Sequence, residues 1–205
     1  MTAAPAGTSS DAGVRRLGLV LLLAGILGLA ASAELAIEKF RLLEDPLYVP
    51  PCTLGGAVDC GSVMTSDQAS AFGFPNPFLG LAGFAGVLVA GLAVASGARP
   101  GRWFWLVVQA GMAFAVVFVH WLIFQGLYRV GALCPFCIAV WVATIPAFWY
   151  VTLHNLQDVA ARPSRLGAVA RIARENHGIV LTVWLLLVAA LLVERFWAPW
   201  DSVFA

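Results

Sequence analysis

Charged residues are scarce in this sequence. They make up 11% of its 205 residues, whereas a soluble domain carries about 25%. Hydrophobic residues account for 61% of the chain. This balance excludes an ordinary soluble domain and predicts an integral membrane protein. The net charge of +1 gives no indication of a nucleic-acid partner.

The signatures of several redox cofactors are also missing. The sequence has no nucleotide-binding glycine pattern, no CxxCH haem-attachment motif and no cysteine run of the iron–sulfur type. Lysine is nearly absent, because eleven of the twelve basic residues are arginine and Lys39 is the only lysine. Abundant alanine, glycine and valine accompany the arginines, and this usage is typical of a GC-rich genome. Cysteine is present in an even number, four, and every cysteine lies near the end of an apolar segment.

Long apolar runs predict an all-α chain with five membrane-spanning helices. The runs cover residues 17–37, 78–96, 103–124, 134–154 and 179–197. Residues 1–16 are expected to form a disordered cytoplasmic tail, residues 17–197 the membrane domain, and residues 198–205 an external tail. The long connection at 34–77 is expected to be an external loop that carries two of the cysteines.

The first apolar run has an alternative interpretation. Two arginines at 15–16, a leucine-rich core and the sequence Ala-Ser-Ala at 31–33 resemble a cleaved signal peptide. The apolar character continues through Leu35 and Ile37 instead of stopping. We therefore favour a retained helix.

Basic residues are distributed unevenly between the two sides of the predicted membrane domain. The amino-terminal tail and the connections at 97–102 and 155–177 carry eight arginines, whereas the opposite side carries four basic residues. Because lysine and arginine are enriched on the cytoplasmic side, this places the amino terminus in the cytoplasm and the carboxyl terminus outside. All four cysteines are then extracytoplasmic, where disulfides persist.

The segment Cys134-Pro135-Phe136-Cys137 begins the fourth run and is the strongest candidate for chemistry. Two thiols three residues apart share one face of a helix. Free backbone N–H groups and the positive end of the helix dipole favour thiolate over thiol there. Pro135 is compatible with the first turn of a helix. Taken alone, the motif fits a redox dithiol and half of a metal site about equally well.

Cys52 and Cys60 lie in the external loop, which we expect to be mobile and functional, with one short interfacial helix over 62–72. Two cysteine pairs on one oxidising face suggest a relay by thiol–disulfide exchange. The electrons must then leave the protein. A lipid-soluble quinone is the favoured two-electron acceptor, because the other redox signatures are absent.

Three segments in this order resemble the bacterial branch of the vitamin K epoxide reductase family. They are residues 60–66, 72–80 and 134–137, and the spacing of Cys52 and Cys60 also matches. The resemblance extends over residues 17–197. It implies a four-helix bundle around a quinone site with a peripheral fifth helix. It also implies oxidation of an extracytoplasmic thioredoxin-fold protein of the DsbA-like kind, with the electrons passed to quinone.

The resemblance assigns a role to each cysteine. Cys52 is expected to accept attack from the thiolate of the partner protein. Cys60 then passes the electrons to Cys134, and Cys137 is the thiol next to the quinone ring. No metal is expected.

The resemblance also suggests residues that hold the quinone. Asn76 is expected to donate a hydrogen bond to a quinone oxygen and to stabilise charge that develops there. Ser62 and Ser66 are expected to order a helix that covers the pocket. The apolar pocket lining is expected to include Phe72, Phe74, Phe78 and Trp141. The animal enzymes have tyrosine at the position of Trp141, so neither epoxide chemistry nor the same hydrogen bond is implied.

The identities of the partner protein and of the quinone are inferred less directly from the sequence. Many bacterial members carry a thioredoxin domain after the fifth helix, whereas this sequence ends at Ala205, so a separate partner is expected. The GC-rich residue usage favours menaquinone over ubiquinone. His120 and Gln109 lie within the third run, and hydrogen-bonded structural roles are favoured for both.

Other classes of protein compete with this interpretation. A heavy-metal carrier would use the four thiols as ligands, but metal transporters usually place such groups within their spans. A DsbB-type oxidase uses similar chemistry with the two cysteine pairs in the reverse order. A purely structural membrane protein is the remaining class. A test of whether the protein reduces a quinone when a reduced partner is supplied distinguishes the heavy-metal carrier from the relay.

Overall fold

The computed structural model describes the backbone of residues 8–197 and the side chains of residues 13–196. Within that range, the chain is helical, and its only β-type pairing consists of isolated bridges. The elements are α1 (Thr8–Glu44), α2 (Cys60–Thr65), the 3₁₀ turn η1 (Asp67–Ser70), α3 (Pro77–Ala95), α4 (Arg102–Gln125), the π-helical turn η2 (Gly126–Val130), α5 (Pro135–Asn155), α6 (Gln157–Ala160), α7 (Arg165–Glu175) and α8 (His177–Trp197). The expectations for residues 1–7 and for the tail at 198–205 lie outside these described residues.

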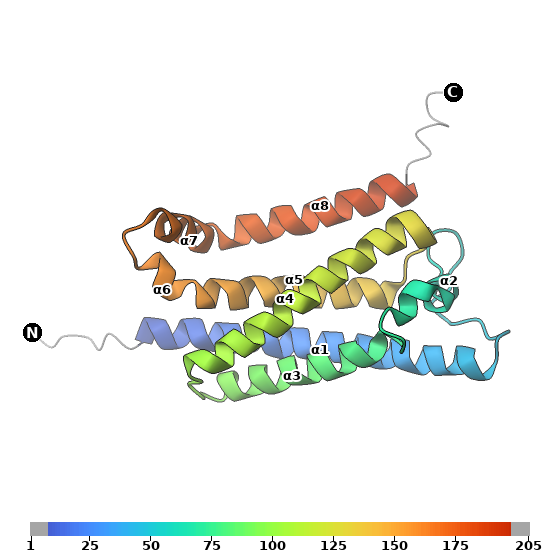
Figure 1. The fold of residues 1–205 in the computed structure, drawn as a ribbon, viewed down its shortest axis with the longest axis horizontal. Coiled ribbons are helices and arrows are strands. Elements are labelled where there is room, and N and C mark those ends of the chain that lie inside the picture. The colour runs from blue at the N-terminus through green and yellow to red at the C-terminus, as the bar shows by residue number, and fades with distance from the viewer. Residues whose placement is uncertain (1–7, 198–205) are drawn as a thin grey trace, which may run out of the picture.

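Five of the described helices are long and apolar enough to cross a membrane, namely α1, α3, α4, α5 and α8. This confirms the prediction of an all-α membrane protein with five spanning helices. Helices α1, α3, α4 and α5 form a bundle, and α8 runs along its outside (Figure 1). Helix α2 and the start of α5 lie at one end of this bundle, whereas α6 and α7 lie at the other.

Helices α1 and α3 have the closest contact in the bundle because glycines line it. A Cβ atom added at Gly25 would lie 2.6 Å from Cα of Leu88, and one added at Gly18 would lie 2.7 Å from the backbone nitrogen of Ala95. Small residues allow such an approach of two backbones, and van der Waals packing then stabilises the pair within lipid. The buried residues of α1, including Leu21, make this helix an integral part of the core, which favours a retained span over a cleaved signal peptide.

The first helix is longer at both ends than expected. It begins at Thr8, inside the expected disordered tail, and it continues through Glu44, so the external loop starts about ten residues later than position 34. Glu38 falls within the segment expected to be a loop, but it lies in α1 and is buried in a hydrogen-bonded cluster. Its two carboxylate oxygens accept hydrogen bonds from Tyr48 Oη and Arg41 Nη1, both at 2.8 Å.

The connections also contain more structure than expected. The single helix expected over 62–72 is replaced by α2 and η1, because Ser66 between them is extended, with a ψ of 151°. The connection between α4 and α5 begins with the π-helical turn η2, and the polar connection at 155–177 contains α6 and α7. Such short helices depend on capping and tertiary contacts, which apolar periodicity does not report.

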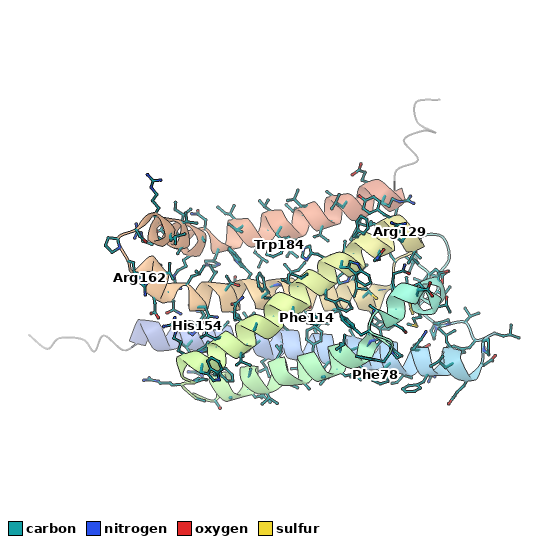
Figure 2. The ribbon with its side chains drawn as sticks, viewed as in Figure 1. Phe78, Phe114, Arg129, His154, Arg162 and Trp184 are labelled. Atoms are coloured by element: carbon teal, nitrogen blue, oxygen red, sulfur yellow. A yellow bond between two sulfur atoms is a disulfide. The ribbon has the colours of Figure 1, made fainter. Side chains whose placement is uncertain are left out.

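Helix α8 is peripheral, since none of its apolar window is buried. Apolar side chains such as Leu192 pack it against the bundle, and hydrogen bonds add to the attachment. Trp184 lies between α8 and the bundle (Figure 2), and its indole N–H donates to Nε2 of His120 at 3.0 Å. Nδ1 of His120 is 2.7 Å from the carbonyl oxygen of Val116, so both ring nitrogens are occupied and the structural role expected for His120 fits. Arg195 Nε donates to the carbonyl of Leu127 at 3.0 Å.

Candidate active site

The four cysteines gather at one end of the bundle. Cys52 and Cys60 form a disulfide, whereas Cys134 and Cys137 are free thiols. The sulfur atoms of Cys60 and Cys134 are 3.3 Å apart, and these two residues are 0% and 1% exposed. The two pairs are therefore close enough for direct thiol–disulfide exchange.

Backbone pairing brings the two cysteine segments together. Val58 and Leu133 form an isolated parallel bridge, in which the Asp59 N–H donates to the carbonyl of Leu133 at 3.1 Å and the Leu133 N–H donates to the carbonyl of Ala57 at 2.8 Å. Cys60 and Cys134 directly follow this bridge in their two segments. Hydrogen bonds therefore hold the segment of the second loop cysteine against the start of α5, and the mobility of the loop stays a prediction.

A side-chain cap fixes the helix that carries Cys60. Asp59 is the N-cap of α2, and its carboxylate accepts hydrogen bonds from the backbone N–H and the hydroxyl of Ser62. These bonds, that of the Ser62 hydroxyl first, lower the pKa of Asp59, and the Thr53 hydroxyl adds to the effect. Ser62 therefore orders α2 through its cap, as expected of a helix-ordering residue. The Ser66 hydroxyl donates to the carbonyl of Val63 at 2.7 Å and orders the opposite end.

Replacing Asp59 with alanine should loosen α2 by about 1 kcal/mol, the usual contribution of an N-cap. A carboxylate with a lowered pKa stabilises the folded form above its unfolded pKa, and this contribution is lost as the pH falls through the folded pKa. The hydrogen-exchange protection factors of the α2 amides, which are corrected for the pH dependence of the intrinsic exchange rate, should therefore fall in the wild type as the pH drops through the lowered pKa of Asp59. The D59A variant should exchange faster already at pH 7 and lose that acid dependence, whereas D59N, which still caps, should retain most of the protection at pH 7. Equal protection in wild type and D59A would contradict the assignment.

Cys134 is the better nucleophile of the dithiol. It is the N-cap of α5, and Pro135 is the first residue of that helix, as the sequence predicts. A hydrogen bond from the Cys137 thiol lowers the pKa of Cys134, and the backbone N–H groups of Cys137 and Phe136 lower it further, while burial opposes them. Because the thiolate is the reactive form, this arrangement directs Cys134 towards the Cys60 sulfur.

A large apolar cavity adjoins the dithiol. It has a volume of about 950 Å³ and lies mainly between α3 and α4, with Cys134, Cys137 and Trp141 on its wall. Cβ atoms added at Gly83 or Gly86 of α3 would meet nothing within 4 Å, so these glycines keep the space open. Its volume is in the range of cofactor and small-molecule pockets.

The cavity is open at the side of the bundle. Val89 of α3 and Val107 and Phe114 of α4 line it, yet all three are more than half exposed. Phe114 is seen on α4 near the middle of the molecule (Figure 2). Both helices are membrane spans, so this side faces the lipid acyl chains. A lipid-soluble molecule can therefore enter without passing through water.

The expected quinone ligands are only partly at the cavity. Asn76, Trp141 and Ser66 line it, whereas Ser62 does not. The Asn76 side chain donates from Nδ2 to the carbonyl of Gln68 at 2.7 Å and accepts at Oδ1 from the Ala71 N–H at 3.1 Å. An amide nitrogen has two N–H groups, so one is left to donate to a ligand.

The phenylalanines just before α3 and in its first turn do not line the cavity, which corrects that part of the expected pocket. Phe74 and Phe78 are 41% and 38% exposed. Phe78 turns towards α1, where its ring meets the edge of Phe40 with centroids 5.8 Å apart. Phe72 packs instead against Phe118, with ring centroids 5.4 Å apart. Phe118, which does line the cavity, takes the place expected for these residues.

Two cavity residues were missed by the sequence analysis. Lys39 lines the cavity, and its Nζ donates to the carbonyl of Met64 at 2.6 Å, which ties α1 to α2. Gln125, the last residue of α4, lines it with a buried Oε1 that has no hydrogen-bond partner among the described residues. Both are polar residues at the end of an apolar run, and that position was the available signal.

Three of the sulfurs also satisfy the distances of a metal site. Those of Cys52, Cys60 and Cys134 lie within 4.8 Å of one another. Two of the three share a disulfide bond, and metals bind thiolates. The arrangement therefore fits disulfide exchange and does not fit a metal centre.

The sequence model of the vitamin K epoxide reductase family matches residues 19–152, more than half of the chain. The chain belongs to this family. The matched segment contains all four cysteines and the helices that form the cavity. No individual curated protein matches the chain. The family consists of membrane oxidoreductases that use a quinone, so this protein is a multi-pass membrane oxidoreductase.

Proposed function

We propose that this protein oxidises a thioredoxin-fold protein outside the cytoplasmic membrane and passes two electrons through its cysteines to a quinone, thereby supporting disulfide formation. The observation that carries the proposal is the 3.3 Å separation between the sulfurs of Cys60 and Cys134. It connects a disulfide in the surface loop with a dithiol beside an apolar cavity.

The first exchange takes place at Cys52. A thiolate of the partner attacks Cys52, the Cys52–Cys60 bond breaks, and Cys60 leaves as a thiolate. The partner's second thiol then displaces Cys52, so the partner leaves oxidised and the loop pair is reduced. The surface around Cys52 suits a protein partner, because Leu47, Val49 and Leu54 are exposed apolar side chains outside the membrane spans.

The second exchange takes place between the two pairs. The Cys60 thiolate attacks Cys134 of an oxidised Cys134–Cys137 pair, and Cys137 leaves as a thiolate. Cys52 then attacks Cys60, which restores the loop disulfide and releases Cys134. The arrangement with a loop disulfide and a free dithiol corresponds to the state reached after this step.

The dithiol is finally reoxidised at the cavity. A sulfur–sulfur bond forms between Cys134 and Cys137, and a quinone supplies the chemistry that takes up the two electrons and two protons. The cavity fits such a ring, because it is apolar, opens to lipid and has on its wall the amide of Asn76, which retains a free N–H donor. We propose menaquinone as the physiological acceptor on the basis of the GC-rich residue usage.

Purified protein in lipid nanodiscs should reduce a naphthoquinone when a reduced thioredoxin-fold protein is supplied, forming one partner disulfide for each quinone consumed. Absorbance of the quinone and thiol titration of the partner measure the two halves of the reaction. The C52S variant should lose the reaction with the protein partner, and a partner with alkylated thiols provides the control. Absence of quinone reduction, together with stoichiometric bound metal, would favour a metal carrier instead.

We also propose that the cysteine end of the bundle faces away from the cytoplasm, as the arginine distribution supports. A membrane-impermeant maleimide added to intact, reduced cells should then label Cys52 before Cys137. Cys52 lies in the external loop, whereas Cys137 lies in α5 on the wall of the apolar cavity, where a charged reagent enters poorly. Labelling of these cysteines only from the cytoplasmic side would contradict this orientation.

A further inference from the structure

Helix α7 presents an apolar face that no described part of the chain covers. Leu166, Val169 and Ile172 follow one another at a spacing of three residues and are 74%, 64% and 60% exposed. Gly167 and Ala170 lie on a different face of the helix and are buried. Exposed apolar side chains of this size on one face of a helix indicate an apolar neighbour outside the chain.

The rest of the protein holds this helix in place. The Ser164 hydroxyl accepts a hydrogen bond from a backbone N–H of the first turn at 3.0 Å and caps its start. Arg171 Nη1 donates to the carbonyl of Ala160 at 3.2 Å. Arg174 Nη1 donates to the carbonyl of Leu153 at 2.7 Å. An isolated helix of 11 residues would be marginal in water, so these contacts keep α7 folded and its exposed face preformed.

The position of α7 corresponds to a membrane surface. The helix lies between the spans α5 and α8, and only Asn176 separates it from the start of α8. Figure 1 shows α7 nearly end-on at the end of the bundle opposite α2, so its axis crosses the direction of the spans. At its junction with α8, Trp149 Nε1 donates to the carbonyl of His177 at 3.0 Å, and Tyr150 Oη lies 3.3 Å from Nδ1 of this histidine. Tryptophan and tyrosine are enriched at the headgroup level of a bilayer, which places the junction there.

Arginines accompany the apolar face. Arg162 lies in the turn before α7 (Figure 2), and Arg165 is the first residue of the helix. Both are exposed, and neither has a hydrogen-bond or ion-pair partner for its side chain among the described residues. Arg171 is also exposed, and its bond to a backbone carbonyl leaves other guanidinium N–H groups available. Guanidinium groups bind phosphate through paired hydrogen bonds, so this surface fits a layer of phosphate groups.

An anionic membrane fits this surface better than a second copy of the chain does. A second copy would bring the same arginines together, and like charges on facing surfaces repel one another. The connection at 155–177 carries four arginines but only two acidic residues, Asp158 and Glu175, so a copy has too few carboxylates to pair with them. For a basic amphipathic helix, attraction to anionic lipids adds to the burial of its apolar face.

We propose that α7 is a binding site for anionic phospholipids at the membrane surface. Its three exposed apolar side chains insert at the boundary between headgroups and acyl chains, and its exposed arginines bind the phosphates. Because α7 leads directly into α8, the bound lipid fixes the start of this peripheral helix relative to the bundle. The site lies at the opposite end of the bundle from α2 and the start of α5, and it does not depend on the redox reaction.

Native mass spectrometry measures the lipid preference. The protein is released from nanodiscs that contain equal amounts of phosphatidylglycerol and phosphatidylcholine, and the lipids that stay bound are counted. The wild type should retain an excess of phosphatidylglycerol. R162Q/R165Q should lower this excess about tenfold, the effect expected when two basic residues are removed from an anionic surface.

The variant R15Q/R16Q is the matched control. It removes the same charge from exposed residues of α1 at the same end of the bundle, and it should change the excess less than twofold. Since all four arginines are exposed, neither variant should alter the thermal unfolding temperature in phosphatidylcholine alone. That measurement separates a loss of lipid binding from a folding defect.

Photocross-linking identifies what covers the apolar face. The photoreactive residue p-benzoylphenylalanine replaces Val169, and membranes from the expressing cells are irradiated. Mass spectrometry should find a covalent phospholipid adduct. The same replacement at Glu175, which is exposed on a different face of α7, should give less of this adduct.

The proposal is overturned if the wild type retains no excess of phosphatidylglycerol, or if R162Q/R165Q and R15Q/R16Q change that excess equally. It is also overturned if the residue placed at Val169 cross-links to a second copy of the chain or to another protein in place of lipid.

Discussion

Replacing Cys137 with serine should stop quinone reduction, lowering its rate on the order of a thousandfold, as expected when a reacting group is removed. Cys137 is the member of the dithiol that can close the Cys134 disulfide, and both line the cavity. Without it, no sulfur–sulfur bond can form in this pair and no electrons can reach the ring. The measurement is the steady-state rate in nanodiscs with a reduced thioredoxin-fold partner.

The same replacement, combined with C52S, allows the proximity of Cys60 and Cys134 to be tested by cross-linking. When Cys52 is also replaced by serine, only Cys60 and Cys134 remain, and their sulfurs lie 3.3 Å apart. Mild oxidation of this C52S/C137S protein should join them, and peptide mapping by mass spectrometry without reduction should find the cross-link. The matched control C52S/C134S leaves Cys60 and Cys137 and should cross-link far less. A control that cross-links equally well would contradict the assigned order of the relay.

The second large effect is expected on the free energy of unfolding, at the contact between α1 and α3. Replacing Gly25 with alanine places a methyl group 2.6 Å from Cα of Leu88, and backbone atoms cannot move aside as a flexible side chain can. Helices α1 and α3 must then separate, which we expect to lower the free energy of unfolding by about 3 kcal/mol, at the upper end of overpacking effects. The thermal unfolding temperature in nanodiscs measures the change.

Gly13 offers the matched control. It lies on the same helix, and a methyl group added there would meet nothing within 4 Å. G13A should therefore leave the unfolding temperature unchanged or raise it slightly, because alanine is the better helix former. Equal unfolding temperatures for G25A and the wild type would show that α1 and α3 do not depend on this close contact.

The architecture could be predicted largely from the sequence, because membrane spans are specified locally. A run such as 103–124 must be helical in lipid, where every backbone group has to be satisfied within its own segment. The cysteine pair could be found for a similar reason, because only cysteine carries a thiol and two cysteines at a helix start form a recognisable dithiol motif. Both signals belong to the segment itself and need no knowledge of the neighbours.

The remaining features depended on tertiary contacts. Glu38 reads as a loop residue until Tyr48 and Arg41 are seen to satisfy its carboxylate. Phe78 reads as a pocket residue until its ring is seen against Phe40 of α1. Gln125 gave only a weak signal, because a polar residue at the end of a span is ordinarily explained by nearby water. Its position on the cavity wall is a property of the assembled bundle.

The sideways opening between α3 and α4 lowers the affinity that the site needs for its ligand. Its ligand would partition from the bilayer, where hydrophobic rings accumulate far above their aqueous level, so a weak intrinsic fit is enough to keep the site filled. An isoprenoid chain can also trail out through the gap past Val89 and Val107. The protein then does not select for the length of the isoprenoid chain, and it distinguishes lipid electron carriers by their rings alone.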